Sequence, residues 1–208
     1  MYKRQVNVLA SEGDYTHKMP QYTRVLSESL EKTEGLLENL LVWTQTQMKG
    51  YKVNPSNQHL KEFVESNVGF FADMAAQKAI KLSSNTTVCE PVFLDTAVLE
   101  IILRNLLHNA LKFTPNGGEI QVSSRQENNA LVLEVTDSGL GMDPEGLDRV
   151  RKRAGLYTTP GTNKESGTGL GLMLCYELVS LLKGTITIRS EKEKGSTFSL
   201  ILPLTKIS

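Results

Sequence analysis

The sequence is short of cysteine, of any excess of one charge and of long apolar runs. Its 208 residues include two cysteines, and its 23 basic residues balance 23 acidic ones. Without a net charge, the chain lacks the field that draws proteins to nucleic acid. Without about 18 consecutive apolar residues, it lacks the pattern of a membrane-spanning helix. We therefore expect a cytoplasmic segment that contacts neither nucleic acid nor membrane, and leave open the membrane anchoring of a longer parent protein.

The two cysteines also restrict the chemistry. Cys89 and Cys175 are far apart, and neither lies in a CxxC or Cys-His spacing. This pattern disfavours a metal site and predicts reduced, buried thiols in a reducing compartment. Hydrophobic residues make up 39% of the chain and charged residues 22%, a composition typical of a folded globular protein.

Residues 21–49 contain no proline and a single glycine. Their mostly apolar positions step by four and three, at Leu26, Leu30, Thr33, Leu37, Leu40, Thr44 and Gln47. Such a seam favours a helix that pairs in a bundle or a coiled coil over an internal core helix. Gly50 and Pro55 are expected to end it. We therefore predict a helical region over residues 1–54 and a second domain over 55–208.

From Pro55 onward, helical and strand periods alternate, and Asp95 is a plausible N-cap. Helices are predicted over Gln58–Ala79, Val98–Phe113 and Gly169–Lys183, and strands over Ala79–Leu82, Glu119–Arg125, Ala130–Thr136, Thr185–Arg189 and Ser196–Leu202. The pair Asn128-Asn129 favours a hairpin turn. Strands that are mostly antiparallel, with a few helices, indicate an α+β two-layer sandwich.

The stretch ESGTGLGLML places glycines where a helix should begin, at Gly167, Gly169 and Gly171. Glycine lets the backbone approach a ligand closely, and the first N–H groups of a helix lack intrahelical partners. A glycine-rich loop before a helix therefore suits a phosphate or another anion. Alone, the pattern fits a flexible loop before a buried helix about as well.

Two further motifs carry polar groups that suit a nucleotide. Asn105, Asn109 and Lys112 share one face of a predicted helix, where amide oxygens could hold Mg²⁺ and the ammonium could contact phosphate; His108 points elsewhere. Asp137 ends a predicted strand beside Gly139 and could accept a hydrogen bond from a base amino group. The alternatives are a solvated polar face and a turn in which Asp137 bonds its own backbone.

Together these motifs resemble a known family. The ordered pieces NLLHNALKFTPNGG, DSGLGM, GTGLGLMLCYELV and GSTFSLILP are similar to the ATP-binding catalytic domain of sensor histidine kinases, over about Ser56–Pro203. The helix ending LLENLLVWTQTQMKG resembles the second helix of the family's dimerisation and phosphoacceptor domain. The resemblance implies a Bergerat-type fold, a mixed and mostly antiparallel sheet with helices on one face, preceded by a long bundle-type helix.

The resemblance also implies roles for individual residues. Asn109 would bind Mg²⁺ between the phosphates with support from Asn105, and Lys112 would contact phosphate. Asp137 would bind the adenine amino group, with Thr197 helping through a shared water. The remaining expected contacts to ATP are Phe113, Gly139, Gly141, Met142, Gly167, Thr168, Gly169, Leu170 and Gly171. A mobile lid would run from Met142 to Ser166, and Lys164 within it could reach the phosphates.

Two features depart from the family pattern. The lid has no Phe and offers instead Leu147, Val150, Leu156 and Tyr157. The phosphoacceptor box is missing, since neither His17 nor His59 is followed by the expected acid and proline. We therefore expect a fragment of an ATP-dependent protein-histidine kinase that does not phosphorylate itself alone.

The whole enzyme would move the ATP γ-phosphoryl group to a His outside this chain and on to an Asp of a response-regulator receiver domain, as a homodimer paired through the helical region. Two alternatives stay open: an ATP hydrolase or clamp of the same superfamily, and a non-catalytic nucleotide-binding signalling module. In the hydrolytic relatives a Glu stands where this chain has Asn105.

Overall fold

The computed structural model describes residue 23 and residues 52–88, 91–152, 158–163, 165 and 169–204. All of these except Thr23 belong to one compact unit, Gln45–Ser208. The helix predicted over residues 21–49 therefore lies outside the described residues, apart from Thr23. Within the described residues, no helix combines the length and apolar character needed to cross a membrane.

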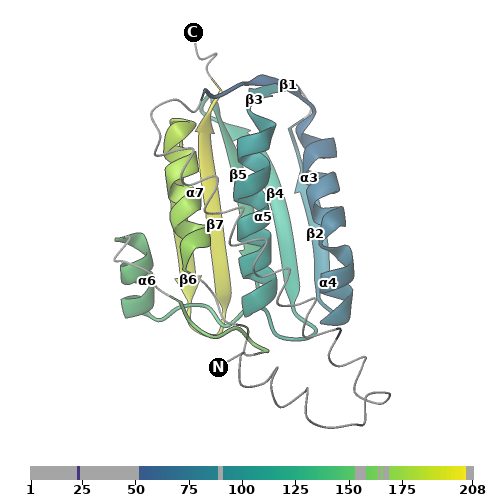
Figure 1. The fold of residues 1–208 in the computed structure, drawn as a ribbon, viewed down its shortest axis with the longest axis vertical. Helices are drawn as coiled ribbons and strands as arrows, with labels where there is room; N and C mark the ends of the chain where they lie inside the picture. Colours follow the sequence, from purple (N-terminus) through teal and green to yellow (C-terminus); the bar gives the residue numbers. More distant parts are fainter. Residues whose placement is uncertain are drawn as a thin grey trace. The chain divides into compact units, whose positions relative to one another are not determined.

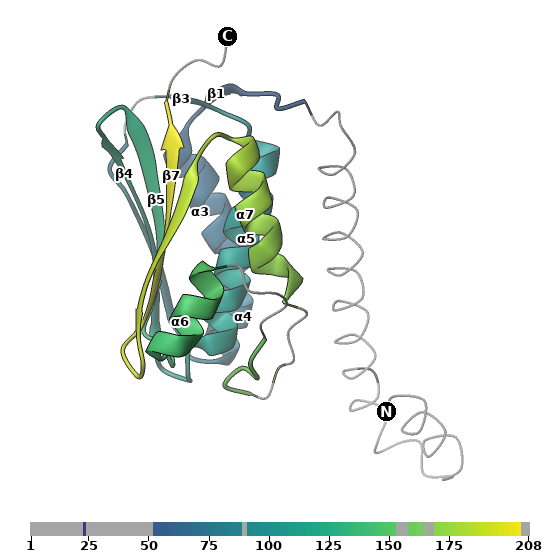
Figure 2. The same cartoon turned by 90° about the vertical axis from the view of Figure 1, so that its left-hand side faces the viewer.

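The unit has two layers, a mixed sheet and a layer of helices on one of its faces (Figures 1 and 2). Its elements are β1 (Ser56–Gln58), α3 (Leu60–Phe70), α4 (Ala72–Gln77), β2 (Lys81–Thr86), β3 (Val92–Leu94), α5 (Thr96–Phe113), β4 (Glu119–Glu127), β5 (Ala130–Asp137), α6 (Pro144–Arg151), α7 (Leu170–Leu181), β6 (Thr185–Glu191) and β7 (Gly195–Pro203). This arrangement confirms the α+β two-layer prediction.

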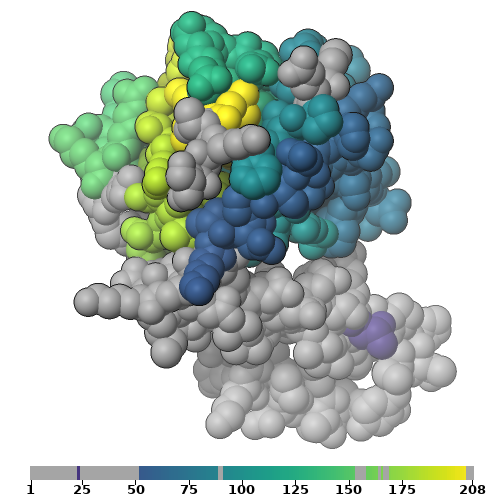
Figure 3. All heavy atoms as spheres, turned by 90° about the horizontal axis from the view of Figure 1, so that it is seen from above, coloured from purple at the N-terminus to yellow at the C-terminus, as the bar shows by residue number. Residues whose placement is uncertain are grey.

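The five-stranded sheet has the order β2-β4-β5-β7-β6. Strand β2 runs parallel to β4, and the other neighbours are antiparallel. Asn128 and Asn129 have φ values of +49° and +61°, which is the left-handed pair of a two-residue hairpin turn, as predicted. The short strands β1 and β3 form a separate pair at the end of the unit seen in Figure 3.

Helix α5 forms the centre of the core. Asp95 caps it, since its side chain accepts a hydrogen bond from the Val98 amide at 3.2 Å, as predicted. The fully buried leucines and isoleucines of α5, α7 and the sheet are Leu99, Ile102, Leu103, Leu106, Leu107, Ile120, Leu131, Leu133, Leu174, Leu178, Leu200 and Leu202. Cys175 lies among them as a buried free thiol, and burial raises its pKa to about 12.

Three predictions on elements need correction. The helix predicted over Gln58–Ala79 is two helices, α3 and α4, because the chain leaves helical geometry at Phe71 (φ −95°, ψ 3°). The strand predicted over Ala79–Leu82 begins only at Lys81 and extends to Thr86. The range predicted as a lid contains helix α6, which begins at Pro144 after its N-cap Asp143. The Asp143 side chain accepts from the Gly146 amide at 2.7 Å.

Candidate functional site

Helix α5 carries the predicted amide pair. The Asn105 amide nitrogen donates to the carbonyl of Ile101 at 2.8 Å. A Cβ on Gly171 would lie only 2.6 Å from the side-chain oxygen of Asn105, so Asn105 and α7 are in close contact. Asn109, one turn further on, is half-buried, and no hydrogen bond recorded among the described residues involves its side chain. Among the described residues, the Asn109 oxygen therefore keeps its capacity to accept a ligand.

The start of α7 lies against this face of α5. Gly169 caps α7 in the left-handed region, with φ +74°, where a residue with a Cβ would be strained. Leu170 and Gly171 follow it in the first turn of α7. Gly167 and Thr168, two further expected ATP contacts, lie outside the described residues.

Asp137 ends β5 as a buried carboxylate, only 5% exposed. Its Oδ1 accepts from the Gly139 amide at 2.8 Å and from the Ser196 amide at 3.2 Å. Burial raises the pKa of Asp137 to about 6, and the two backbone hydrogen bonds oppose that rise. Both bonds end on Oδ1, so within the described part of the chain Oδ2 remains the acceptor for an incoming donor.

The loop after Asp137 is fixed on two sides. The Leu140 amide donates to the carbonyl of Phe113 at 3.1 Å, and the Met142 amide donates to Ser190 Oγ at 2.9 Å. Gly141 between them has φ +60°, and a Cβ on it would collide with the backbone oxygen of Glu191. The end of α5 and the β6–β7 hairpin therefore hold the Asp137 carboxylate in place.

Lys112 lies at the C-terminal end of α5 and is 7% exposed. Its Nζ donates to the carbonyl of Thr159 at 3.0 Å and lies 4.6 Å from the centre of the Phe113 ring. Burial lowers the Lys112 pKa, and the charge of Glu165 opposes that change. Residues of the predicted lid thus contact Lys112 directly, while Lys164 lies outside the described residues.

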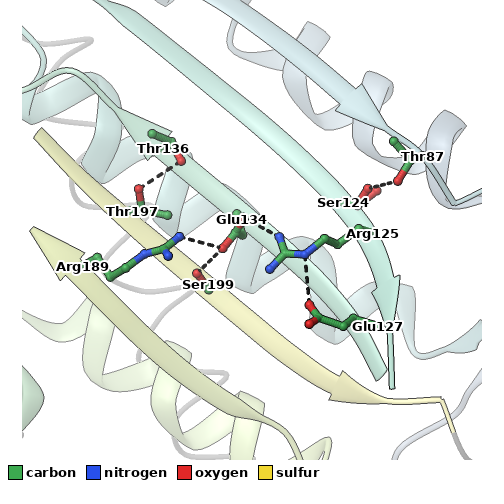
Figure 4. Close-up of polar contacts among 9 residues, drawn as sticks. All are labelled: Thr87, Ser124, Arg125, Glu127, Glu134, Thr136, Arg189, Thr197 and Ser199. Carbon is green, nitrogen blue, oxygen red and sulfur yellow. Dashed lines mark hydrogen bonds and ion pairs between the residues drawn. The ribbon is translucent and has the colours of Figure 1, made fainter. Parts of the chain in front are cut away.

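Thr197 does not lie beside Asp137, contrary to its expected role. It pairs with Thr136 across β5 and β7, and their hydroxyl oxygens are 3.2 Å apart on the open face of the sheet (Figure 4). Side chains alternate between the faces of a strand, so Ser196, paired with Asp137, lies on the helix-covered face. The same alternation, read from the inward Phe198, could have identified Ser196 from the sequence.

The open sheet face carries a separate polar cluster (Figure 4). Glu134 accepts from Arg125 at 2.6 Å, from Arg189 at 3.3 Å and from Ser199 at 2.7 Å. These residues line a hollow of about 350 Å³. The hollow lies on the opposite face of the sheet from Asp137 and α5, so it is not part of the candidate site.

Sequence reasoning missed two other polar groups near the site. Lys78, at the end of α4, donates to the carbonyl of Leu111 at 2.6 Å and so touches α5 one residue before Lys112. Ser190 Oγ lies 2.9 Å from Ser196 Oγ and accepts from the Met142 amide. Both act through long-range contacts, which leave no local pattern in the sequence.

Comparison with known proteins adds family relationships to this geometry. Residues 94–206 match the family described as histidine kinase-, DNA gyrase B-, and HSP90-like ATPase. The chain is 31% identical over 176 residues to the sensor protein EvgS of Escherichia coli K12. The matched region covers 82% of this chain and 14% of EvgS. The chain thus spans a small part of that relative's length.

Solved structures show the same fold. The Acinetobacter baumannii histidine kinase AdeS matches with a TM-score of 0.72 and 23% identity, over 88% of this chain and 84% of AdeS. The histidine kinase ThkA, solved in complex with the response regulator protein TrrA, matches with a TM-score of 0.76 and 18% identity, over 98% of this chain and 56% of ThkA.

Proposed function

The chain belongs to the histidine kinase-, DNA gyrase B-, and HSP90-like ATPase family and carries the ATP-binding catalytic domain of sensor histidine kinases, and from this premise we propose how it holds ATP. The adenine binds at Asp137, and the phosphates bind between Asn109, Lys112 and the start of α7. The buried Asp137 carboxylate, with Oδ1 bonded to two backbone amides, is the observation that carries this proposal.

At the adenine end, Asp137 Oδ2 accepts a hydrogen bond from the exocyclic amino group. Ser196 takes the supporting role first expected of Thr197, because its amide bonds Asp137 and its side chain is on the same sheet face. Gly139 and Gly141 let the loop after Asp137 pack against Phe113 and Glu191, and the neighbouring Phe113 and Met142 frame the base. A charged acceptor in a buried position discriminates strongly against ligands without the matching donor.

At the phosphate end, the available groups fit a magnesium nucleotide. Asn109 offers a hard oxygen ligand that suits Mg²⁺, and the Asn105 amide, held by Ile101, supports the same face. Lys112 supplies positive charge, and Gly169, Leu170 and Gly171 lie at the N-terminal end of α7, which is the positive end of the helix dipole. When bound, Mg²⁺ would neutralise phosphate charge. We propose that Gly167 and Thr168 also contact the phosphates.

The whole protein would be a histidine kinase of a two-component system. We propose that residues 1–54 are part of a dimerisation region, that 55–208 are the catalytic domain, and that the γ-phosphoryl group passes to a His outside this chain. ThkA in complex with the response regulator TrrA supports a receiver domain as the next acceptor. Asn105 supports transfer over hydrolysis, because a neutral amide cannot take a proton from water.

Calorimetry of ATP binding, with and without Mg²⁺, tests the site. Asp137→Ala removes a charged hydrogen bond worth about 1.5–3 kcal/mol, so affinity should fall about 10- to 150-fold. Asn109→Ala should weaken ATP binding mainly when Mg²⁺ is present. Glu119→Gln, on an exposed side chain paired with Lys81, is the matched control. Variants of Asp137 and Asn109 that both bind like the control would show that the site is misplaced.

A further inference from the structure

Lys78 makes an unusual set of contacts for a lysine at the end of a short helix. Its side chain is 11% exposed. Its Nζ donates to the carbonyl of Leu111 at 2.6 Å and to Thr162 Oγ1 at 2.7 Å, and lies 3.6 Å from Glu165 Oε1. One ammonium therefore joins α4, the C-terminal end of α5 and a stretch of chain more than 80 residues away.

That stretch, residues 158–163 together with Glu165, is called the docked segment here. The Thr162 amide donates to the carbonyl of Lys112 at 3.0 Å, and Thr162 Oγ1 lies 3.1 Å from the same oxygen. Within the segment, the Gly161 amide donates to the Glu165 carbonyl at 2.9 Å, and the Asn163 amide donates to Glu165 Oε2 at 2.8 Å. The segment thus satisfies the carbonyl of Lys112, in the last turn of α5, where carbonyls lack intrahelical partners.

The docked segment also holds the side chain of Lys112. The carbonyl of Thr159 accepts from Lys112 Nζ at 3.0 Å, and an ammonium has three donors. The side chain of Lys112 also packs against Gly161, since a Cβ on Gly161 would lie only 2.6 Å from the Cγ of Lys112. The direction of the Lys112 ammonium is therefore set by a segment that is itself held by Lys78.

We propose that Lys78 is a positioning residue for nucleotide binding, which orients the Lys112 ammonium toward the phosphates by holding the docked segment against α5. Lys78 does not bind the phosphates itself, since its own ammonium is occupied by Leu111, Thr162 and Glu165. Lys112 keeps its bond to Thr159 and uses its remaining donors for the phosphates. This inference rests on the proposed ATP site, because it assigns Lys112 to the phosphates of ATP.

The test measures ATP and adenosine affinities of Lys78→Met, a change that keeps most of the unbranched apolar side chain and removes its charge. If the segment then docks in about a tenth of the molecules, the apparent Kd for ATP rises about tenfold. Adenosine, which has no phosphate, should bind both proteins alike. Lys81→Met removes an exposed lysine paired with Glu119 and should leave both affinities unchanged.

A double variant of Lys78 and Lys112 tests whether Lys78 acts through Lys112. In a Lys112→Met background, adding Lys78→Met should cause no further loss of ATP affinity, because the two residues act in series. Additive losses, or an equal weakening of adenosine, would overturn the inference and give Lys78 a merely structural role. Thr162→Val removes the hydroxyl that Lys78 contacts and should give the same ATP-specific loss, so it carries the test if Lys78→Met does not fold.

The controls separate this inference from the proposed function. If the unaltered chain binds no ATP, the proposed site fails, and the role of Lys78 fails with it. If the unaltered chain binds ATP and Lys78→Met binds it as tightly as Lys81→Met does, the site stands and only the inference fails.

Discussion

Asp137→Asn should make the protein more stable at neutral pH while weakening its binding of ATP. Burial raises the Asp137 pKa from 3.8 to about 6, so the folded state holds this proton more tightly than the unfolded chain does. The ionised carboxylate therefore opposes folding. This penalty is absent below about pH 4, grows as the pH rises to about 6, and is fully present above it.

The size of the effect follows from the shift. A change of about two pKa units corresponds to about 3 kcal/mol in the free energy of unfolding. Asparagine has no charge to desolvate, and its oxygen can still accept from the Gly139 and Ser196 amides. Asp137→Asn should thus gain up to about 3 kcal/mol at pH 7.5 and almost nothing at pH 4.

Urea unfolding of both proteins at pH 4, 6 and 7.5 measures this gain, and calorimetry at pH 7.5 measures the accompanying loss of ATP affinity. In the unaltered protein, ATP affinity should also fall about tenfold between pH 7.5 and pH 5, as the acceptor becomes protonated. A variant that is less stable than the parent at pH 7.5, or a gain that does not change with pH, would refute the reasoning.

Further outcomes are expected from the same geometry. Gly141→Ala should lower the free energy of unfolding by more than about 1 kcal/mol in urea titrations, because φ is +60° there and the new Cβ meets Glu191. Thr197→Val should leave ATP affinity within about twofold of the parent by calorimetry, because Thr197 lies on the open sheet face and surface changes have small effects. Incubation with γ-labelled ATP and Mg²⁺ should release negligible free phosphate, because Asn105 is no general base; robust release that Asn109→Ala abolishes would favour a hydrolase. Cys175 should resist alkylation in the folded protein at pH 8, because burial keeps its thiol protonated.

The parts of the fold with strong local signals could be predicted from the sequence. Asp95 and the apolar period after it locate α5, and the pair Asn128-Asn129 locates the β4–β5 turn. The strands β1 and β3 have three residues each, too few for a period to show. Helix α6 was missed although Asp143-Pro144 is a good start signal, because the resemblance assigned that range to a lid.

The site residues also divide into those with a local sequence signal and those without one. The face shared by Asn105, Asn109 and Lys112 follows from helical spacing, and the loop after Asp137 follows from its glycines. The sequence motif alone does not separate Thr197 from its neighbour Ser196, because a shift of one residue in a strand exchanges the two sheet faces. Lys78 could not be found at all, since its partners Thr162 and Glu165 are brought to it only by tertiary structure.

The pairing of Asp137 with Ser196 across 59 residues of sequence has a kinetic consequence. The β4–β5 hairpin closes over two residues, whereas β5 meets β7 only after α6, α7 and β6 have been accommodated between them. Contacts of long sequence separation form slowly, because closing the larger loop loses more entropy. In refolding experiments, the ability to bind ATP should therefore return after the helical signal does, as one of the last properties the chain recovers.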